Sequence, residues 1–315
     1  MTLTVLVPDV LVVPEDPIDG VCYVTFDGTG PVPEEWSNAE VLVGWGISDE
    51  LLADAARRLT SLRLLQLSSA GSDNALRAGF APDVVISNGR GLHDRPVAEH
   101  ALALVLAAAR RLHVAAQAQR HHHWSTELGG RQQEPSPGLF STLRGARVVI
   151  WGFGSIGGTL APHLEALGAR VTGVGRTARQ EQRITVVTHD ALPDLLTVTD
   201  VLIMILPSTA QTHHALDRDL LSRLPPHAWV VNVGRGDTVD EGALTVALRE
   251  KRLGGAALDV TEVEPLPARS PLWDDPRVIL TPHAAGGRPL GGFDLLADNL
   301  RALQSGSAFR NVVLR

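Results

Sequence analysis

The chain has 315 residues, more than a single hydrophobic core usually serves, so two domains are expected. With 44% hydrophobic and 20% charged residues it has the composition of a globular protein, and no apolar run approaches the ~20 residues that span a bilayer. A net charge of −7 disfavours nucleic acid as a partner, because no excess of cations is present to displace phosphate counterions. Cys22 is the only cysteine, which excludes an intramolecular disulfide and a metal site built on several thiolates.

The positions of the basic residues exclude several further classes. The first of them is Arg57, so the N-terminal segment lacks the positive charge of a secretory signal or a mitochondrial presequence, and we expect a cytoplasmic protein that binds no membrane. Lys251 is the only lysine and lies in a charged Arg-Glu-Lys-Arg segment, so covalent catalysis through lysine is not expected.

Consecutive helical side chains point about 100° apart, so the run His121, His122, His123 does not predict a metal site.

Short apolar segments alternate with segments of helical periodicity, the pattern of parallel sheets covered by helices. In the first part of the chain we expect a helix at Asp49–Leu59, a long apolar helix at Pro96–Leu112 and a polar loop at Gly129–Gly138. Four strands are expected before the long helix: Leu3–Val7, Val41–Trp45, Arg63–Leu67 and Val84–Ser87.

A second and more regular set of strands and helices begins near residue 147. The last helix of the chain is expected at Leu290–Leu303. The fold class is therefore α/β, with two Rossmann-like domains built on doubly wound parallel sheets. The strands expected in the second set are Arg147–Trp151, Arg170–Val174, Val201–Leu206, Trp229–Val233 and Val278–Thr281.

Residues 148–157, Val-Val-Ile-Trp-Gly-Phe-Gly-Ser-Ile-Gly, contain the glycine pattern of a dinucleotide-binding loop. An apolar strand enters this loop and an apolar helix, Ile156–Leu167, leaves it, which is the context that the pattern requires. Gly152 would permit the tight turn, Gly154 the close approach of the pyrophosphate, and Gly157 the packing of the helix on the strand. The helix N-terminus would supply N–H groups and partial positive charge for the phosphates.

The segment after the next strand indicates the cofactor. It reads Gly175-Arg176-Thr177-Ala178-Arg179 and lacks the acidic residue that binds the ribose 2′-hydroxyl of NAD. Arg176 and Arg179 can instead hold a 2′-phosphate, with Thr177 as a further donor. The alternative is that both arginines are solvated side chains of a loop. We expect NADP(H) as the preferred cofactor and NAD(H) as the alternative.

Three polar segments follow strands of the second set, where open α/β sheets bind ligands. Each places one ionisable residue beside glycine or proline: Arg235 in residues 231–236, Glu264 in residues 257–267 and His283 in residues 280–286. Together with Ser68-Ser69-Ala70-Gly71, Val97-Ala98-Glu99-His100 and Leu206-Pro207-Ser208-Thr209, they resemble the D-isomer-specific 2-hydroxyacid dehydrogenase family over almost the whole chain. The sequences Glu264-Pro265-Leu266-Pro267 and Ser270-Pro271-Leu272-Trp273 are similar to its glyoxylate/hydroxypyruvate reductase branch.

The resemblance implies hydride transfer between NADP(H) and a small 2-keto or 2-hydroxy acid, and three residues fit that chemistry. Arg235 would hold the keto oxygen and the carboxylate by a forked contact. His283 would donate the proton, and Glu264 would bind the other ring nitrogen, fix the tautomer and favour the charged ring. Each of the three, taken alone, could equally be a structural or surface residue. The substrate contacts that the resemblance implies, in a cleft between the two domains, are Ser69, Ala70, Gly71, Arg235 and His283.

Two residues have roles that the sequence leaves open. The resemblance places Asp259 on the nicotinamide side of the cofactor site, although a structural or helix-capping role fits the sequence nearly as well. Trp45 ends a strand of the first domain and could either face the substrate pocket or belong to the core. The remaining expected cofactor contacts, besides the glycines and the arginine segment, are Ser155, Ile156, Leu206, Pro207, Thr212, Val233, Gly234 and Ala285.

By the same resemblance, residues 1–93 with 288–315 form a flavodoxin-like substrate-binding domain, and residues 94–287 form the dinucleotide-binding domain. The two crossings between them, near residues 92–96 and 286–290, are expected hinges that close the cleft. The long helix from Pro96 and the segment after it are expected to form a homodimer contact.

Other functions remain open on this reading of the sequence. A cofactor-sensing corepressor would use the same scaffold, as would an NAD-linked phosphoglycerate, formate or phosphite dehydrogenase, against which Arg176 argues. An unrelated malate or lactate dehydrogenase would carry its glycine loop near the N-terminus, whereas here the loop begins at Gly152.

Overall fold

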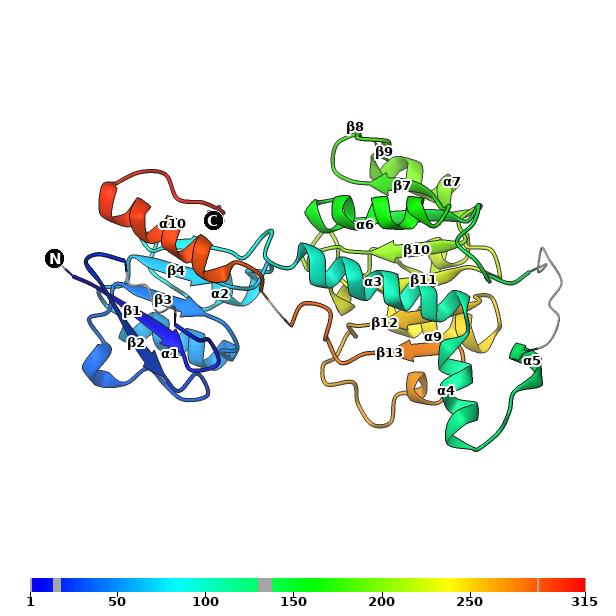
Figure 1. Ribbon diagram of the computed structural model, residues 1–315, viewed down its shortest axis with the longest axis horizontal. Coiled ribbons are helices and arrows are strands. Elements are labelled where there is room, and N and C mark those ends of the chain that lie inside the picture. The colour runs from blue at the N-terminus through cyan, green and yellow to red at the C-terminus, as the bar shows by residue number, and fades with distance from the viewer. Residues whose placement is uncertain (1, 14–17, 130–137, 288, 315) are drawn as a thin grey trace. The chain divides into compact units, whose positions relative to one another are not determined.

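The computed structural model describes residues 2–13, 18–129, 138–287 and 289–314, and the chain divides into two compact units (Figure 1). The first unit is Met1–His93 with Arg288–Arg315, and the second is Asp94–Gly287. Most of the loop expected at Gly129–Gly138 lies outside the described residues. Each unit is an α/β fold with its own sheet, so the predicted fold class is confirmed.

The first unit is built on a five-stranded parallel sheet. Its elements are β1 (Leu3–Pro8), β2 (Val21–Phe26), η1 (Glu34–Trp36), β3 (Val41–Gly44), α1 (Asp49–Arg58), β4 (Leu64–Leu67), α2 (Asp73–Arg77), β5 (Val85–Ser87) and α10 (Gly292–Ser305). The strand order β2-β1-β3-β4-β5 is the flavodoxin-like order. One face of the sheet packs with α1 and α2, and the other packs with α10 (Figure 1).

The second unit is built on an eight-stranded sheet in which only the β8–β9 pair is antiparallel. Its strands are β6 (Arg147–Trp151), β7 (Arg170–Val174), β8 (Arg179–Glu181), β9 (Ile184–Val187), β10 (Val201–Met204), β11 (Trp229–Asn232), β12 (Gly255–Leu258) and β13 (Val278–Leu280). Its helices are α3 (Asp94–Ala109), α4 (Leu112–Arg120), α5 (Thr126–Gly129), α6 (Ser155–Ala166), η2 (His189–Ala191), α7 (Leu192–Leu196), α8 (Arg218–Leu221), η3 (Gly236–Thr238), α9 (Glu241–Arg249) and η4 (Pro271–Trp273).

The strand order of this sheet, β13-β12-β11-β10-β6-β7-β9-β8, contains the doubly wound dinucleotide-binding order, which reverses between β6 and β10. Successive side chains of a strand point to opposite faces. Val148 and Ile150 of β6 therefore pack with α3 and α6, whereas Val149 and Trp151 pack with α7, α8 and α9. Open α/β sheets bind ligands at such a reversal, beyond the carboxyl ends of the strands, which here are β6 and β10.

The long apolar helix ends earlier than predicted. α3 ends at Ala109, and α4 begins at Leu112 after a bend of 71°. Arg111 lies between them with φ of 52°, a left-handed conformation that interrupts a right-handed helix. Within the described ranges, no single helix is both long and apolar enough to cross a membrane; α3 and α4 meet that measure only when the bent pair is counted together.

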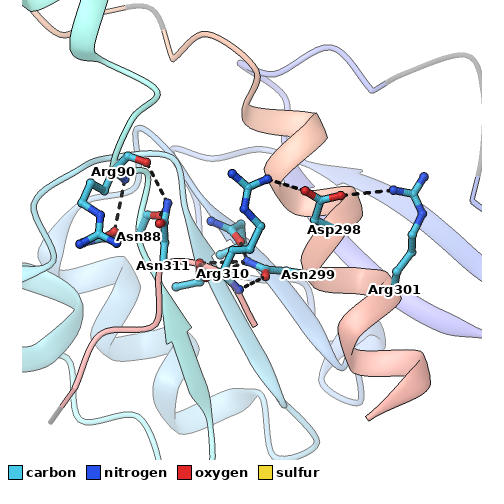
Figure 2. Close-up of polar contacts among 9 residues, drawn as sticks. Asn88, Arg90, Asp298, Asn299, Arg301, Arg310 and Asn311 are labelled. Atoms are coloured by element: carbon cyan, nitrogen blue, oxygen red, sulfur yellow. Dashed lines mark hydrogen bonds and ion pairs between the residues drawn. The ribbon is translucent and has the colours of Figure 1, made fainter. Parts of the chain in front are cut away.

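A buried asparagine fixes the C-terminal segment to the sheet of the first unit (Figure 2). Asn299 of α10 is fully buried; its Nδ2 donates to Gln66 Oε1 at 2.7 Å and to Ser87 Oγ at 3.0 Å. Its Oδ1 accepts the N–H of Arg310 at 2.7 Å. Because buried polar groups are costly when unpaired, this one side chain holds α10, the sheet and the C-terminal segment in register.

Replacing Asn299 by leucine is expected to lower the free energy of unfolding by about 2–4 kcal/mol, because several buried polar groups lose their partner at once. Urea denaturation measures the loss. The matched control is Asp298→Asn, one residue earlier, which removes ion pairs with Arg301 and Arg310 that lie at the surface and costs less than about 1 kcal/mol. A loss for Asn299→Leu no larger than that of the control would contradict the assigned role.

Candidate active site

The glycine loop connects β6 to α6 at the point where the sheet reverses. Gly152 has φ of 95°, and a Cβ there would stand 2.4 Å from the Ile205 carbonyl oxygen, so only glycine fits. Gly154 faces open space, and a Cβ on Gly157 would stand 3.2 Å from the Phe153 ring. α6 starts without a side-chain cap on its N–H groups. The loop therefore has the close turn, the open approach and the helix N-terminus that a pyrophosphate needs.

The predicted ribose-binding segment follows β7. Arg176 and Thr177 are exposed there, and Arg176 has no partner among the residues that the structure describes. Arg179 lies at the start of β8, where its Nη2 is 2.7 Å from Glu181 Oε2 and donates to the Phe153 carbonyl at 2.9 Å. The sequence predicted two comparable arginines; in the structure both are exposed, and Arg179 is paired whereas Arg176 is not.

Arg235 follows β11 in an extended conformation, just before η3. Its carbonyl oxygen accepts hydrogen bonds from Asn232 Nδ2 at 3.0 Å and Thr238 Oγ1 at 2.6 Å, and its Nη1 donates to the Gly234 carbonyl at 2.8 Å. A Cβ on Gly236 would stand 1.9 Å from the Thr261 carbonyl oxygen, so the loop after β11 lies directly against the loop after β12. This contact brings the segment that carries Arg235 close to the segment that carries Glu264.

His283 and Glu264 form a hydrogen-bonded pair. The ring Nδ1 lies 2.7 Å from Glu264 Oε2, and Glu264 Oε1 accepts the Thr261 N–H at 3.2 Å. Burial raises the pKa of Glu264, but the hydrogen bond and charge of His283, the Thr261 N–H and the charge of Arg235 together outweigh it and hold that pKa below its ordinary value. The carboxylate is therefore ionised at neutral pH and accepts the Nδ1 proton, which leaves Nε2 as the ring position for acid–base chemistry.

Asp259 fixes the turn that carries His283. Its buried carboxylate accepts Thr281 Oγ1 at 2.5 Å and the N–H groups of Ala284 and Ala285 at 2.8 and 3.0 Å. Its carbonyl oxygen accepts the His283 N–H at 2.7 Å. His283 itself has φ of 52°, a left-handed conformation that is uncommon for residues other than glycine. The structure thus gives Asp259 a structural role, and its contact with a nicotinamide stays a prediction.

The other predicted cofactor residues lie in loops that follow strands of the same sheet. Thr212 closes the turn after β10, because its Oγ1 donates to the Pro207 carbonyl at 2.6 Å. A Cβ on Gly234 would stand 2.7 Å from the Leu206 nitrogen, so the turns after β10 and β11 touch. Ser155, Ile156, Val233 and Ala285 also lie in the turns or helix starts that follow strands of this sheet; their cofactor contacts stay predictions.

The predicted substrate loop belongs to the first unit, where Ser69, Ala70 and Gly71 follow β4. Ser69 Oγ donates to the Gly71 carbonyl at 2.8 Å, and Asn88 Nδ2 donates to the Ala70 carbonyl at 3.0 Å. The Ala70 and Gly71 N–H groups have no acceptor among the described residues. A shaped loop with two such N–H groups is able to bind a carboxylate.

Trp45 is half-buried in the same unit and stacks on His93, with ring centroids 5.6 Å apart. His93 is buried, and its Nε2 lies 2.6 Å from the Ser68 carbonyl oxygen, one residue before the substrate loop. Trp45 therefore supports the backbone that leads into that loop.

The contacts of two residues in the second unit were not predicted from the sequence. Glu181 pairs with Arg179; the signal was present, because residues two apart on a strand share a face. His100 of α3 has its Nε2 2.9 Å from Thr281 Oγ1 and 3.3 Å from Asp259 Oδ1, a contact between elements far apart in the sequence. His121, by contrast, ends α4 in an exposed turn, and the described part of the chain holds no cluster of three or more metal-ligating side chains.

Sequence similarity identifies the family. Residues 102–285 match the sequence model described as "D-isomer specific 2-hydroxyacid dehydrogenase, NAD binding domain". The chain belongs to this family of oxidoreductases. It is 34% identical over 278 residues to the glyoxylate reductase of Aeropyrum pernix, covering 85% of this chain and 81% of that protein. It is also 34% identical to glyoxylate/hydroxypyruvate reductase B of Pectobacterium carotovorum, covering 88% and 86%.

Solved structures agree with this assignment. A D-isomer specific 2-hydroxyacid dehydrogenase family protein from Aeromonas salmonicida has a TM-score of 0.84 and 27% identity, covering 99% of each chain. A D-isomer specific 2-hydroxyacid dehydrogenase from Xanthobacter autotrophicus, solved in complex with NADPH and MES, has a TM-score of 0.79 and 27% identity, covering 99% of this chain and 98% of that one.

Glu264→Gln is expected to move the alkaline limb of the pH profile of keto-acid reduction to lower pH, because the negative charge that favours the protonated His283 ring is lost. The turnover number should also fall by about 10²-fold, the lower end of what acid–base assistance contributes. Rates measured across pH test both effects.

The matched control is Glu262→Gln, which breaks a similar contact, 3.0 Å from His214 Nε2, two residues away. It should leave the limb in place. An unmoved limb in Glu264→Gln would show that the pair does not set the protonation of the catalytic ring.

Proposed function

We propose that this chain is an NADPH-dependent reductase that converts a small 2-keto acid into the D-2-hydroxy acid, with glyoxylate and hydroxypyruvate as the first substrates to test. The observation that carries the proposal is the contact between Glu264 and His283, at 2.7 Å, in the same unit as a glycine loop of dinucleotide-binding geometry. A carboxylate-backed imidazole supplies a proton, which is what the reduction of a ketone needs besides hydride.

The roles of the residues follow from their chemistry. Arg235 is permanently charged and can bind the keto oxygen together with the substrate carboxylate. His283 gives the proton on Nε2 to the keto oxygen, and Glu264 stabilises the charged ring beforehand through Nδ1. NADPH, when bound, supplies the hydride to the carbonyl carbon. The C=O double bond thus becomes an alcohol, and His283 is left neutral until it regains a proton from solvent.

The residues present fit a bound dinucleotide phosphate. α6 offers uncapped N–H groups where Gly154 leaves open space, and Arg176 offers an exposed guanidinium after β7. The NADPH complex of the Xanthobacter autotrophicus relative supports the same cofactor here. NAD(H) stays the alternative, because the loop and helix bind the parts that both cofactors share.

The first unit is proposed to bind the substrate carboxylate through the Ser69–Ala70–Gly71 loop, whose N–H groups suit an anion. We also propose a homodimer. α4 has no buried residue, Leu112 is 54% exposed and Trp124 is 87% exposed, so this segment offers apolar surface that a second copy would cover. Light scattering on a size-exclusion column measures the mass.

The corepressor alternative and the NAD-linked phosphoglycerate alternative have less support. The two curated relatives described above are named as reductases of glyoxylate or hydroxypyruvate. A corepressor would bind NADPH without turning over any 2-keto acid.

A panel of 2-keto acids, followed by the loss of nicotinamide absorbance, tests the proposal. We expect glyoxylate and hydroxypyruvate to be reduced, with kcat/KM at least about tenfold higher for NADPH than for NADH, because a forked contact to a phosphate is a strong discriminator. Arg235→Lys should lower kcat/KM by about 10²–10³-fold, since the forked contact is lost while the charge remains.

Turnover with NADH in preference to NADPH would overturn the cofactor assignment. Tight NADPH binding without turnover of any acid in the panel would overturn the proposed activity and favour the corepressor.

A further inference from the structure

The side chain of Arg179 is held by several contacts within the protein. Its Nε lies 2.9 Å and its Nη2 lies 2.7 Å from the same oxygen, Oε2 of Glu181. The same Nη2 donates to the Phe153 carbonyl at 2.9 Å. The Nε–Nη2 edge of the guanidinium, one of the two edges that can fork onto a phosphate, is therefore used within the protein.

The other contacts of Arg179 also lead to the glycine loop. Its guanidinium carbon lies 5.9 Å from the centre of the Phe153 ring, and Phe153 is the buried residue between Gly152 and Gly154. Its Nη1 lies beside Gly175, 3.5 Å from where a Cβ would stand. An exposed ion pair alone contributes little to stability. Here, however, a carbonyl, an aromatic ring and a carboxylate all contact the same guanidinium. Arg179 thus fastens β8 to the backbone of the loop.

The position of Glu181 explains why its charge is paired with that of Arg179. Its Oε1 reaches the first turn of α6, where a Cβ on Gly158 would stand 2.9 Å away. The N-terminus of a helix favours a carboxylate, but the same turn is where the pyrophosphate is expected. An unbalanced negative charge there would repel the cofactor. The charge of Arg179 cancels it.

Arg176 differs from Arg179 in its contacts. Both arginines are exposed, but Arg176 lies in the loop two residues after β7 and has no partner among the described residues. We propose that Arg179 is a positioning residue for the glycine loop, with its charge balanced by Glu181, and that Arg176 with Thr177 distinguishes NADPH from NADH. This inference rests on the proposed function for its assignment of NADPH, and it replaces the expectation of two equivalent phosphate-binding arginines.

Calorimetric titration with two fragments, 5′-AMP and 2′,5′-ADP, tests the proposal on the full chain. They differ only in the 2′-phosphate. Arg176→Ala should weaken 2′,5′-ADP about tenfold or more and leave 5′-AMP within about twofold, because one charged contact to the phosphate is lost. Arg179→Ala should weaken both fragments by the same factor, about three- to tenfold, because the loop they share is loosened.

Two further variants complete the experiment. Arg252→Ala is the matched control, because Arg252 pairs with Glu250 as Arg179 pairs with Glu181, at 2.8 Å and two residues apart, and it should change neither affinity. Glu181→Gln should strengthen the binding of both fragments by similar factors, since a negative charge leaves the phosphate turn. It keeps the test informative if Arg179→Ala fails to fold.

If Arg179→Ala weakened the binding of 2′,5′-ADP but not that of 5′-AMP, the proposal would be overturned. A Glu181→Gln variant that bound only 2′,5′-ADP more tightly would overturn it as well. If the unmodified chain binds both fragments equally, the NADPH assignment fails. Equal weakening of both fragments by Arg179→Ala would then still establish the positioning role.

Discussion

The carboxylate of Asp259 is the constraint on which the candidate site depends. It is buried at the end of β12 and accepts three hydrogen bonds, from Thr281 and from the N–H groups of Ala284 and Ala285. These bonds cap a turn in which His283 has a left-handed backbone. A buried carboxyl group with all its hydrogen-bond partners in place is stable, whereas a partly satisfied one is costly, so the turn has one favoured conformation. That conformation presents the ring to Glu264.

The fold explains why such different segments meet at one edge. In a parallel sheet the carboxyl ends of all strands lie on the same side, so the loops after β6, β7, β10, β11, β12 and β13 are neighbours. Close approaches at Gly152, Gly234 and Gly236 bring these loops into backbone contact. The dinucleotide loop, the cation and the carboxylate–imidazole pair therefore belong to one structural unit.

The sequence predicted much of this arrangement because its signals are local. The strand before Gly152 is a continuous apolar run, as a strand buried on both faces must be, and the glycine spacing follows from the turn itself. Val21–Phe26 was missed as a strand although its residues, Val-Cys-Tyr-Val-Thr-Phe, favour strands; it lies at the edge of the sheet and is only partly buried. The break at Arg111 was missed because residues that favour a helix stand on both sides of it. The contacts of His100 with Thr281, and of Arg179 with Phe153, depend on tertiary packing and have no local signature.

A double-mutant cycle of Asp259→Asn and Glu264→Gln, measured as kcat/KM for keto-acid reduction, tests the central claim most directly. If Asp259 acts by holding His283 against Glu264, Asp259→Asn already disrupts the pair. Adding Glu264→Gln should then cause little further loss of kcat/KM. The double variant should then be about as active as Asp259→Asn alone. If the fold losses in kcat/KM of the two single variants multiply in the double variant, the account is contradicted. The turn held by Asp259 would then not position His283 against Glu264.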